Sequence, residues 1–389
     1  MSAEASGESS YSERLELIEA LENRLNTRII VYFLGDRPIA SAVLAGDALE
    51  PLNQHLKDIG ATESLTLFLY GQGGNLQEPW KIINMCRECS NELNVIIPYK
   101  AYSAITLTAV GADKIYMGTM GMLGAIDPQF NMSDHPSISV EDVYSFLNFI
   151  QEHASLADQQ AVSEQLKQLN NEFSPSFIGK IERTHQYIRD VAKDLLLLHK
   201  DPLSDAEIDK IVETLTEKIY LHGHGISRRQ AKEIGLPVVE PDQGLIEDII
   251  QLYQLYKRLL KLDLPPKPEM YFQEDQDLPG TLEGDLYKEE GAQTAIIESS
   301  NLTHAYQGTL KLKRERKIPS NPDINISINA QLPAGINQNQ LPQSIQQKLQ
   351  KKIQGAQNVV VKQVQEQIKA QSPIVNIKKD LLGQWKQIR

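Results

Sequence analysis

The chain has 389 residues, of which 41% are hydrophobic, and a formal net charge of −12. This length suits one large domain with extensions or two domains, and the composition allows a sizeable core. The acidic balance argues against general nucleic-acid binding by the body of the protein. No apolar run approaches the roughly 18 residues that would span a bilayer. The polar start MSAEASGESSYSER lacks the pattern of a signal peptide, so we expect a cytoplasmic protein.

The two cysteines, Cys86 and Cys89, form one CxxC motif inside a stretch with the pattern of an amphipathic helix. No second pair and no nearby histidine completes a zinc site in the sequence, and a redox role would need the motif at the start of a helix. We interpret both residues as ordinary thiols. Their number excludes a disulfide framework.

Strand and helix patterns alternate along the first part of the chain. We expect disorder over 1–13, although a helical pattern already begins at Tyr11 and continues to Asn26. The next elements, in chain order, are strand 28–33, helix 46–59, strand 65–70, helix 76–90, strand 93–98, helix 103–111 and strand 114–117. Alternation at this spacing predicts an α/β fold with a parallel sheet and crossover helices. Sites in such sheets lie beyond the carboxyl ends of the strands.

The second half of the chain is first helical and then changes composition. Helical patterns cover 140–200, 205–220, 227–235 and 244–262, and a strand-like run covers 236–240. A Pro-rich, acidic segment follows, in which Thr294–Ile297 and Tyr306–Leu312 could pair as a hairpin. The last 70 residues are rich in Gln, Asn and Lys and carry +6 (nine Lys and Arg against three Asp and Glu), which leaves −18 for the rest.

These changes divide the chain into four parts. They are a disordered N-terminus (1–13), a main domain (14–263), a linker with the possible hairpin (264–319), and a low-complexity tail (320–389). Few large apolar residues in the tail favour disorder, with at most a local helix over Leu341–Lys369.

The residues that suggest a catalytic site follow the ends of two expected strands. Gly73 and Gly74 follow one expected strand, and Ser103 follows the next one at the start of a helix. A serine nucleophile needs exposure at a sharp turn, a base, and N–H donors for an oxyanion. The N–H of Ala104 and a glycine N–H could be those donors, because the first turn of a helix leaves N–H groups free and glycine permits close approach. A structural interpretation stays open, in which the glycines form a turn and Ser103 caps the helix.

Four motifs, in the right order, resemble the Clp-protease fold and most of all the SDH-type Clp-fold serine proteinases. GQGGN is similar to the glycine turn SPGG of that fold, and AYSAITLTAVGADKIYMG is similar to its nucleophile helix and following strand. GMLGAIDPQ resembles the signature GPIDPQ, and LHGHGISRRQAKEIGLPV resembles the segment that begins THDYPI and ends GLPV. The resemblance covers about residues 28–242. It extends to signal peptide peptidase A and, more distantly, to crotonases.

The resemblance implies a Clp/crotonase-like fold, a homo-oligomer, and a serine peptidase that cleaves peptides or unfolded proteins without a metal or organic cofactor. By position, Ser103 matches the nucleophile, Gly73 and Gly74 match the oxyanion turn, and Ala104 matches the residue after the nucleophile. Many relatives have two glycines after this serine, where this chain has Ala104-Ile105. We expect the β-branched Ile105 to narrow the approach to the serine.

The resemblance does not identify the residue that acts as the general base for Ser103. The histidine of Clp protease would fall near Asp127, which could instead cap a turn, so that triad cannot simply be copied. Signal peptide peptidase A uses a Ser–Lys dyad, and its lysine matches Lys167 best and Lys180 second. His222 matches the histidine of the THDYPI segment and could act as the base or as an orienting partner of Asp127. A lysine can be the base only if burial or a nearby positive charge lowers its pKa.

Two other functions remain open. A catalytically inactive Clp-fold scaffold could keep the oligomer and bind a partner protein through the extension 264–389, because a basic tail on an acidic body suits such a contact. A crotonase-like acyl-CoA enzyme would use the same oxyanion architecture, although the sequence has no evident basic cluster for the phosphates of CoA. Covalent labelling of Ser103 by a fluorophosphonate distinguishes the peptidase from the scaffold.

Overall fold

The computed structural model of the chain describes residues 3–130, 138–145, 174–217, 225–273, 277–317 and 341–389. The chain forms two compact units. Unit 1 comprises Met1–Pro266, Gly291–Thr309 and Leu382–Arg389, and unit 2 comprises Lys267–Glu290 and Leu310–Leu381. The break after residue 266 lies close to the expected end of the main domain at 263. Two later segments, however, rejoin unit 1 instead of belonging to a separate linker and tail.

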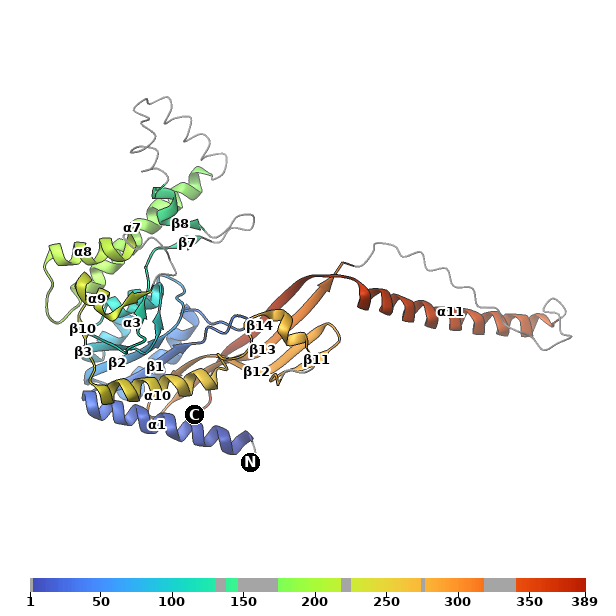
Figure 1. Ribbon diagram of the computed structural model, residues 1–389, viewed down its shortest axis with the longest axis horizontal. Helices are drawn as coiled ribbons and strands as arrows, with labels where there is room; N and C mark the ends of the chain where they lie inside the picture. The colour runs from blue at the N-terminus through green and yellow to red at the C-terminus, as the bar shows by residue number, and fades with distance from the viewer. Residues whose placement is uncertain (1–2, 131–137, 146–173, 218–224, 274–276, 318–340) are drawn as a thin grey trace, which may run out of the picture. The chain divides into compact units, whose positions relative to one another are not determined.

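A sheet organises unit 1 (Figure 1). Its parallel part consists of β1 (Arg28–Leu34), β2 (Thr62–Tyr70), β3 (Ser90–Ile97), β5 (Lys114–Met117) and β10 (Val238–Val239). These strands lie in the order β10-β5-β3-β2-β1, and each of these neighbours pairs in parallel. The predicted parallel sheet is thereby confirmed, with strand bounds that shift by a few residues.

Helices cover both faces of this sheet (Figure 1), which is why β1 is a continuous apolar run whose residues after Arg28 are all buried. One face carries α1 (Ala3–Leu25) and α10 (Gln243–Leu259), whose apolar residues form one core cluster with Val31 and Phe33. The other face carries α2 (Leu49–Ile59), α3 (Glu78–Arg87), α4 (Ala104–Val110), α7 (Pro175–Leu197) and α8 (Asp205–Thr216), which build the larger core cluster.

Helix α1 begins at Ala3, so residues 3–13 are helical where we expected disorder. The segment contains Ala and Glu, which favour helix, and only Gly7 opposes it strongly. Short elements complete the described chain: η1 (Gly46–Ala48), β4 (Lys100–Ala101), β6 (Met122–Leu123), β7 (Gln129–Phe130), β8 (Ile138–Ser139), β9 (Ile226–Ser227), α9 (Arg228–Ile234), η2 (Pro268–Phe272) and β11 (Thr281–Glu283).

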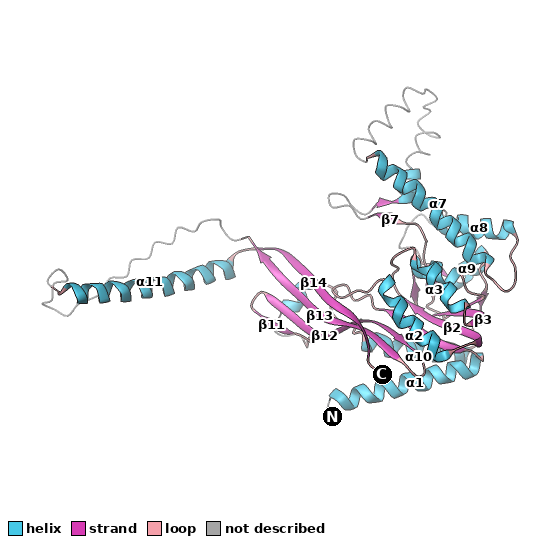
Figure 2. Ribbon diagram, turned by 180° about the vertical axis from the view of Figure 1, so that it is seen from behind, coloured by secondary structure: helices cyan, strands magenta, loops and turns pink. Residues whose placement is uncertain are grey.

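The C-terminal extension adds strands to the sheet beyond β1. β12 (Leu286–Glu298) pairs antiparallel with β1, with Glu298 opposite Val31. β13 (Thr303–Arg316) and β14 (Ile374–Gln387) continue the order β1-β12-β13-β14, and Figure 2 shows β12, β13 and β14 side by side. The expected hairpin forms with longer strands. The tail contains the expected local helix, α11 (Gln343–Gln371), but β14 is a strand that its polar sequence does not predict.

Both cysteines lie at the end of α3 rather than at a helix start. Cys86 is buried and Cys89 is half-buried, and both are free thiols. Burial raises the pKa of each thiol, which keeps it protonated and unreactive. Among the described helices, none is long and apolar enough to cross a bilayer.

A buried histidine pair joins α2 to the hairpin β12–β13. The Nδ1 atom of His55 hydrogen-bonds the Ser299 hydroxyl at 2.7 Å, and its Nε2 atom lies 3.1 Å from Nδ1 of His304. Burial and the neighbouring His304 lower the pKa of His55 to about 4, and burial lowers the pKa of His304. The folded protein therefore keeps these rings neutral at pH values where the unfolded chain would protonate them.

We predict that acid destabilises unit 1 through His55. Its pKa is about 4 in the folded protein and about 6.5 in an unfolded chain. Between these values the unfolded chain binds more protons, so the free energy of unfolding falls as the pH falls. The full window corresponds to about 3 kcal/mol.

Urea denaturation from pH 7 to pH 4 should show this loss in the wild type, and a smaller loss in His55→Asn. The stability difference between the two proteins should therefore narrow toward pH 4. A difference that does not change with pH would contradict a neutral, buried His55.

Candidate active site

Ser103 lies at a sharp turn between β4 and α4. Its backbone has φ 51° and ψ −119°, a conformation that is strained for any residue with a Cβ and persists only where the surroundings impose it, at a cost of about 1–3 kcal/mol. The residue is nearly buried, with 9% of its surface exposed. Its side chain makes no capping hydrogen bond to α4. The interpretation of Ser103 as an ordinary helix cap therefore does not hold.

Hydrogen bonds on both sides of the serine hold this turn. The N–H of Tyr102 donates to Gly71 O at 3.1 Å, and the N–H of Gly71 donates to Lys100 O at 2.9 Å. Behind the serine, the Thr106 hydroxyl donates to Ala101 O at 2.6 Å and accepts from another backbone N–H. The end of β2 and the segment that carries Ser103 are thus joined by main-chain hydrogen bonds.

The glycine turn touches Ser103 directly. Gly73 has φ +122°, and a Cβ added there would lie 2.8 Å from Ser103 Cβ and 3.2 Å from its Oγ. Gly74 has φ +157°, and a Cβ there would lie 2.2 Å from the carbonyl oxygen of Leu44. Both positions therefore require glycine, and the strand ends that the sequence places at one edge of the sheet do meet.

Three N–H groups beside Ser103 are available to a ligand. Within the described residues, the N–H groups of Gly73, Gly74 and Ala104 donate to no recorded acceptor. The neighbouring groups are occupied, because Leu44 N–H donates to Gly73 O at 2.8 Å and Asn75 N–H donates to Leu44 O at 2.7 Å. A cleft of about 770 Å³ borders the turn. Gly74–Gln77 line one side of it, and residues of α7 between Lys180 and Asp190 line the other.

Ile105 does not lie over the serine as we expected. Its side chain is 1% exposed and belongs to the core cluster, and its Cγ1 atom would contact a Cβ added at Gly71 at 3.5 Å. The side chain packs inward because α4 is buried along its whole length.

The expected bases are not brought to Ser103 among the residues that the structure describes. Asp127 is buried, with 4% of its surface exposed. Lys180 is exposed on α7, with its Nζ 5.1 Å from the centre of the Phe130 ring. Neither hydrogen-bonds the Ser103 hydroxyl. Lys167 and His222 lie outside the described residues.

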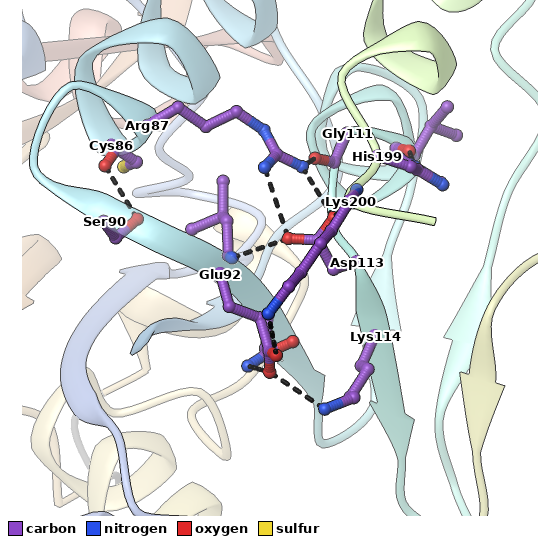
Figure 3. A network of polar contacts seen from close by, with 12 residues as sticks. Cys86, Arg87, Ser90, Glu92, Gly111, Asp113, Lys114, His199 and Lys200 are labelled. Atoms are coloured by element: carbon purple, nitrogen blue, oxygen red, sulfur yellow. Dashed lines mark hydrogen bonds and ion pairs between the residues drawn. The ribbon is translucent and has the colours of Figure 1, made fainter. Parts of the chain in front are cut away.

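A polar network at the far end of α4 fixes α7 (Figure 3). Asp113 accepts from the Arg87 guanidinium at 3.2 Å and from the N–H of Lys200 at 2.7 Å. His199 hydrogen-bonds Val110 O at 2.7 Å. Burial alone would raise the pKa of Asp113, but these bonds lower it. The segment ADKI (residues 112–115) therefore anchors α7, and α7 lines the cleft. The segment itself does not contact Ser103. The sequence feature that could have revealed this role is the acidic residue Asp113 directly before β5.

The fold and the strained serine point to one group of hydrolases, and a comparison with protein families identifies it. The model of the ClpP-like SDH-type serine proteinases matches residues 11–272. The chain belongs to this family. The resemblance stated from the motifs is thereby confirmed, and the match begins earlier and ends later than residues 28–242.

Relatives of this chain include two uncharacterized proteins of Methanocaldococcus jannaschii. One is 26% identical over 63% of this chain and 79% of its own length. The other is 22% identical over 67% of this chain and 80% of its own length.

Two solved structures are similar to this chain in fold. The 1510-N membrane-bound stomatin-specific protease is 13% identical, with coverage of 61% of this chain and 84% of its own and a TM-score of 0.36. ClpP1 from Listeria monocytogenes is 14% identical, with coverage of 58% and 98% and a TM-score of 0.31.

We predict that Gly73→Ala disturbs Ser103 more than it disturbs the fold. The new Cβ would lie 2.8 Å from Ser103 Cβ on a backbone with φ +122°. Reaction of Ser103 with a fluorophosphonate should slow at least about tenfold, and the free energy of unfolding should fall by about 2 kcal/mol.

Gly60→Ala is the matched control, because Gly60 also has a positive φ (+68°) but has open space around it. This variant should lose about 1 kcal/mol of stability and keep the wild-type labelling rate. Equal labelling rates in the two variants would argue against the contact between Gly73 and Ser103.

Proposed function

We propose that the protein is a serine peptidase that cleaves peptide bonds through an acyl-enzyme on Ser103. The observation that carries this proposal is the contact between a strained, uncapped serine and a glycine turn whose N–H groups have no recorded acceptor. A backbone held in this state at a stability cost indicates function more than folding. Membership in a serine proteinase family supports the same reaction class.

In the proposed reaction, Ser103 Oγ attacks the peptide carbonyl carbon and its proton passes to a general base. The carbonyl oxygen becomes an oxyanion, which accepts hydrogen bonds from N–H groups of Gly73, Gly74 or Ala104. The intermediate then collapses, the C–N bond breaks, and the amine leaves with the proton. Water hydrolyses the acyl-enzyme by the same steps. No metal or organic cofactor takes part.

The base is one of the residues named from the sequence. Lys167 and His222 remain the first candidates, because the described residues supply no base within hydrogen-bond distance of the serine. Lys180 lines the cleft beside the glycine turn and is a further candidate, and Asp127 fits best as the partner that orients His222. The nearly buried serine and the adjacent cleft suit an extended peptide or an unfolded protein segment rather than a folded substrate.

We predict that a fluorophosphonate labels Ser103 and that Ser103→Ala abolishes the labelling, measured by intact mass and peptide mapping. Ser90→Ala is a matched control, because Ser90 is also buried but donates to Cys86 O away from the turn. It should keep the wild-type rate. A folded wild type that neither labels nor cleaves peptides would overturn the peptidase proposal and favour the inactive scaffold.

The base can be assigned with three single variants, Lys167→Ala, His222→Ala and Lys180→Ala. Loss of the general base should slow labelling by about 10²- to 10⁴-fold, whereas the other two variants should stay within about threefold of wild type. An intermediate loss in Asp127→Asn together with a large loss in His222→Ala would indicate an Asp–His pair. Equal rates in all four variants would exclude every candidate.

We further propose that the protein is a cytoplasmic homo-oligomer and that its extension 264–389 binds a partner protein. Light scattering should then give a mass that is a multiple of the 43.7 kDa chain. A mass of one chain at all concentrations would contradict the oligomer, independently of the labelling result.

A further inference from the structure

Asp36 lies at the point where three strand ends meet next to the glycine turn. It follows β1 by two residues and its side chain is 13% exposed. The peptidase mechanism above does not use it. Its carboxylate accepts hydrogen bonds from three side chains, which come from two segments of the chain and all belong to unit 1.

The three donors are the side chains of Tyr70, Gln72 and Lys100. The Tyr70 hydroxyl, at the end of β2, donates to Oδ1 of Asp36 at 2.8 Å. The Gln72 amide donates to Oδ2 at 2.9 Å, and the Lys100 ammonium donates to Oδ2 at 2.6 Å. Gln72 directly precedes Gly73, and Lys100 precedes Ser103 by three residues. One carboxylate thus binds both segments that form the site.

Two of these donors are themselves held in place. The ring of Tyr70 stacks on Phe33 at 4.2 Å between ring centres and contacts Tyr253 at 5.5 Å. The ammonium of Lys100 lies 5.1 Å from the centre of the Tyr99 ring. Gln72 is exposed and has no such packing, so the bond to Asp36 is the side-chain contact that restrains this residue of the turn.

The segment that carries Asp36 also holds the turn through its backbone. The N–H of Ala42 donates to Gly35 O at 2.8 Å, which closes residues 35–42 into a loop. Two residues later, Leu44 bonds to Gly73 O and to the N–H of Asn75. The segment 36–44 therefore contacts the glycine turn at two places. Asp36 bonds to Gln72, which precedes Gly73, and Leu44 bonds to Gly73 O and to the N–H of Asn75.

The charge of the Asp36 carboxylate is consistent with its three hydrogen bonds. Burial alone would raise the pKa of Asp36, but the bonds from Lys100, Tyr70 and Gln72 lower it. The carboxylate therefore stays ionised at neutral pH and acts only as an acceptor, which the three donors require.

We propose that Asp36 is a positioning residue that keeps the glycine turn 71–75 in register with Ser103, an inference that rests on the proposed peptidase function. Asp36 touches neither the serine nor the N–H groups. It acts through Gln72 on one side and Lys100 on the other, and so fixes the distance between the oxyanion donors and the nucleophile.

The test compares Asp36→Asn, Asp36→Glu and Asp285→Asn in the full chain. Asp285 is the matched control, because its ion pair with Arg316 has similar exposure (22% and 13%) to the pair of Asp36 with Lys100 (13% and 24%) but lies in unit 2. The readouts are kcat and KM for a peptide substrate, and hydrogen–deuterium exchange of peptides across the described residues of unit 1.

We expect Asp36→Asn to lower kcat about 10- to 100-fold, because small misplacements of catalytic groups have effects of this size, while KM changes less than about threefold. Amide exchange should accelerate in residues 71–77 and stay unchanged elsewhere in unit 1. Asp36→Glu, which keeps the carboxylate, should recover most of kcat, and Asp285→Asn should match the wild type.

Unchanged exchange at 71–77 together with an unchanged kcat would overturn the proposal. Faster exchange throughout unit 1 would also overturn it, since Asp36 would then only stabilise the fold. The wild type could prove inactive while amide exchange at 71–77 still accelerates in Asp36→Asn and not in the other two variants. In that case the peptidase function fails, and the restraint of the turn by Asp36 stands.

Discussion

The structure of the site depends on the close approach of two backbones, at Gly73 and Ser103. This approach is possible because Gly73 lacks a Cβ, which would otherwise lie 2.8 Å from that of Ser103. The hydrogen-bonded strands of the sheet hold the two backbones together. Parallel strands β2 and β3 bring their carboxyl ends to one edge, and hydrogen bonds between Gly71 and the segment of Lys100 extend that pairing up to the serine. The strained backbone of Ser103 persists because these surrounding contacts impose it.

Three carboxylates with little exposure each join separate segments of the chain. Asp36 joins the loop after β1 to the glycine turn and to β4, Asp113 joins α3 to the end of α7, and Glu298 accepts from Arg14, Tyr256 and Thr303. Each has several donors, because removing a carboxylate from water is costly unless hydrogen bonds replace those to water. Such groups add little net stability compared with apolar packing. Their value lies in a directional geometry, which apolar contacts alone do not impose.

The sequence predicted the parallel sheet because strand and helix patterns alternate between residues 28 and 117, and it placed Gly73 and Ser103 together because both follow strands. It did not reveal Asp36 or β14. Asp36 bonds to residues 34 to 64 positions away, and no local pattern encodes such a contact. β14 mixes Ile, Val, Leu and Trp with Lys and Gln and lies in a tail that is polar overall, and it pairs with β13. Ile105 faces the core because α4 is buried on all sides, which its short sequence does not specify.

The antiparallel pairing of β1 with β12 has a consequence for how the protein is made. β1 is synthesised long before β12, because the residues that pair with Leu34 and Val31 are Ala295 and Glu298. Contacts between such distant segments form late, because a long chain must close before they add stability. The edge of β1 is therefore unsatisfied on the ribosome until the extension emerges. The sheet beside β1, and with it the loop that follows β1, is therefore completed only after β12 has been translated.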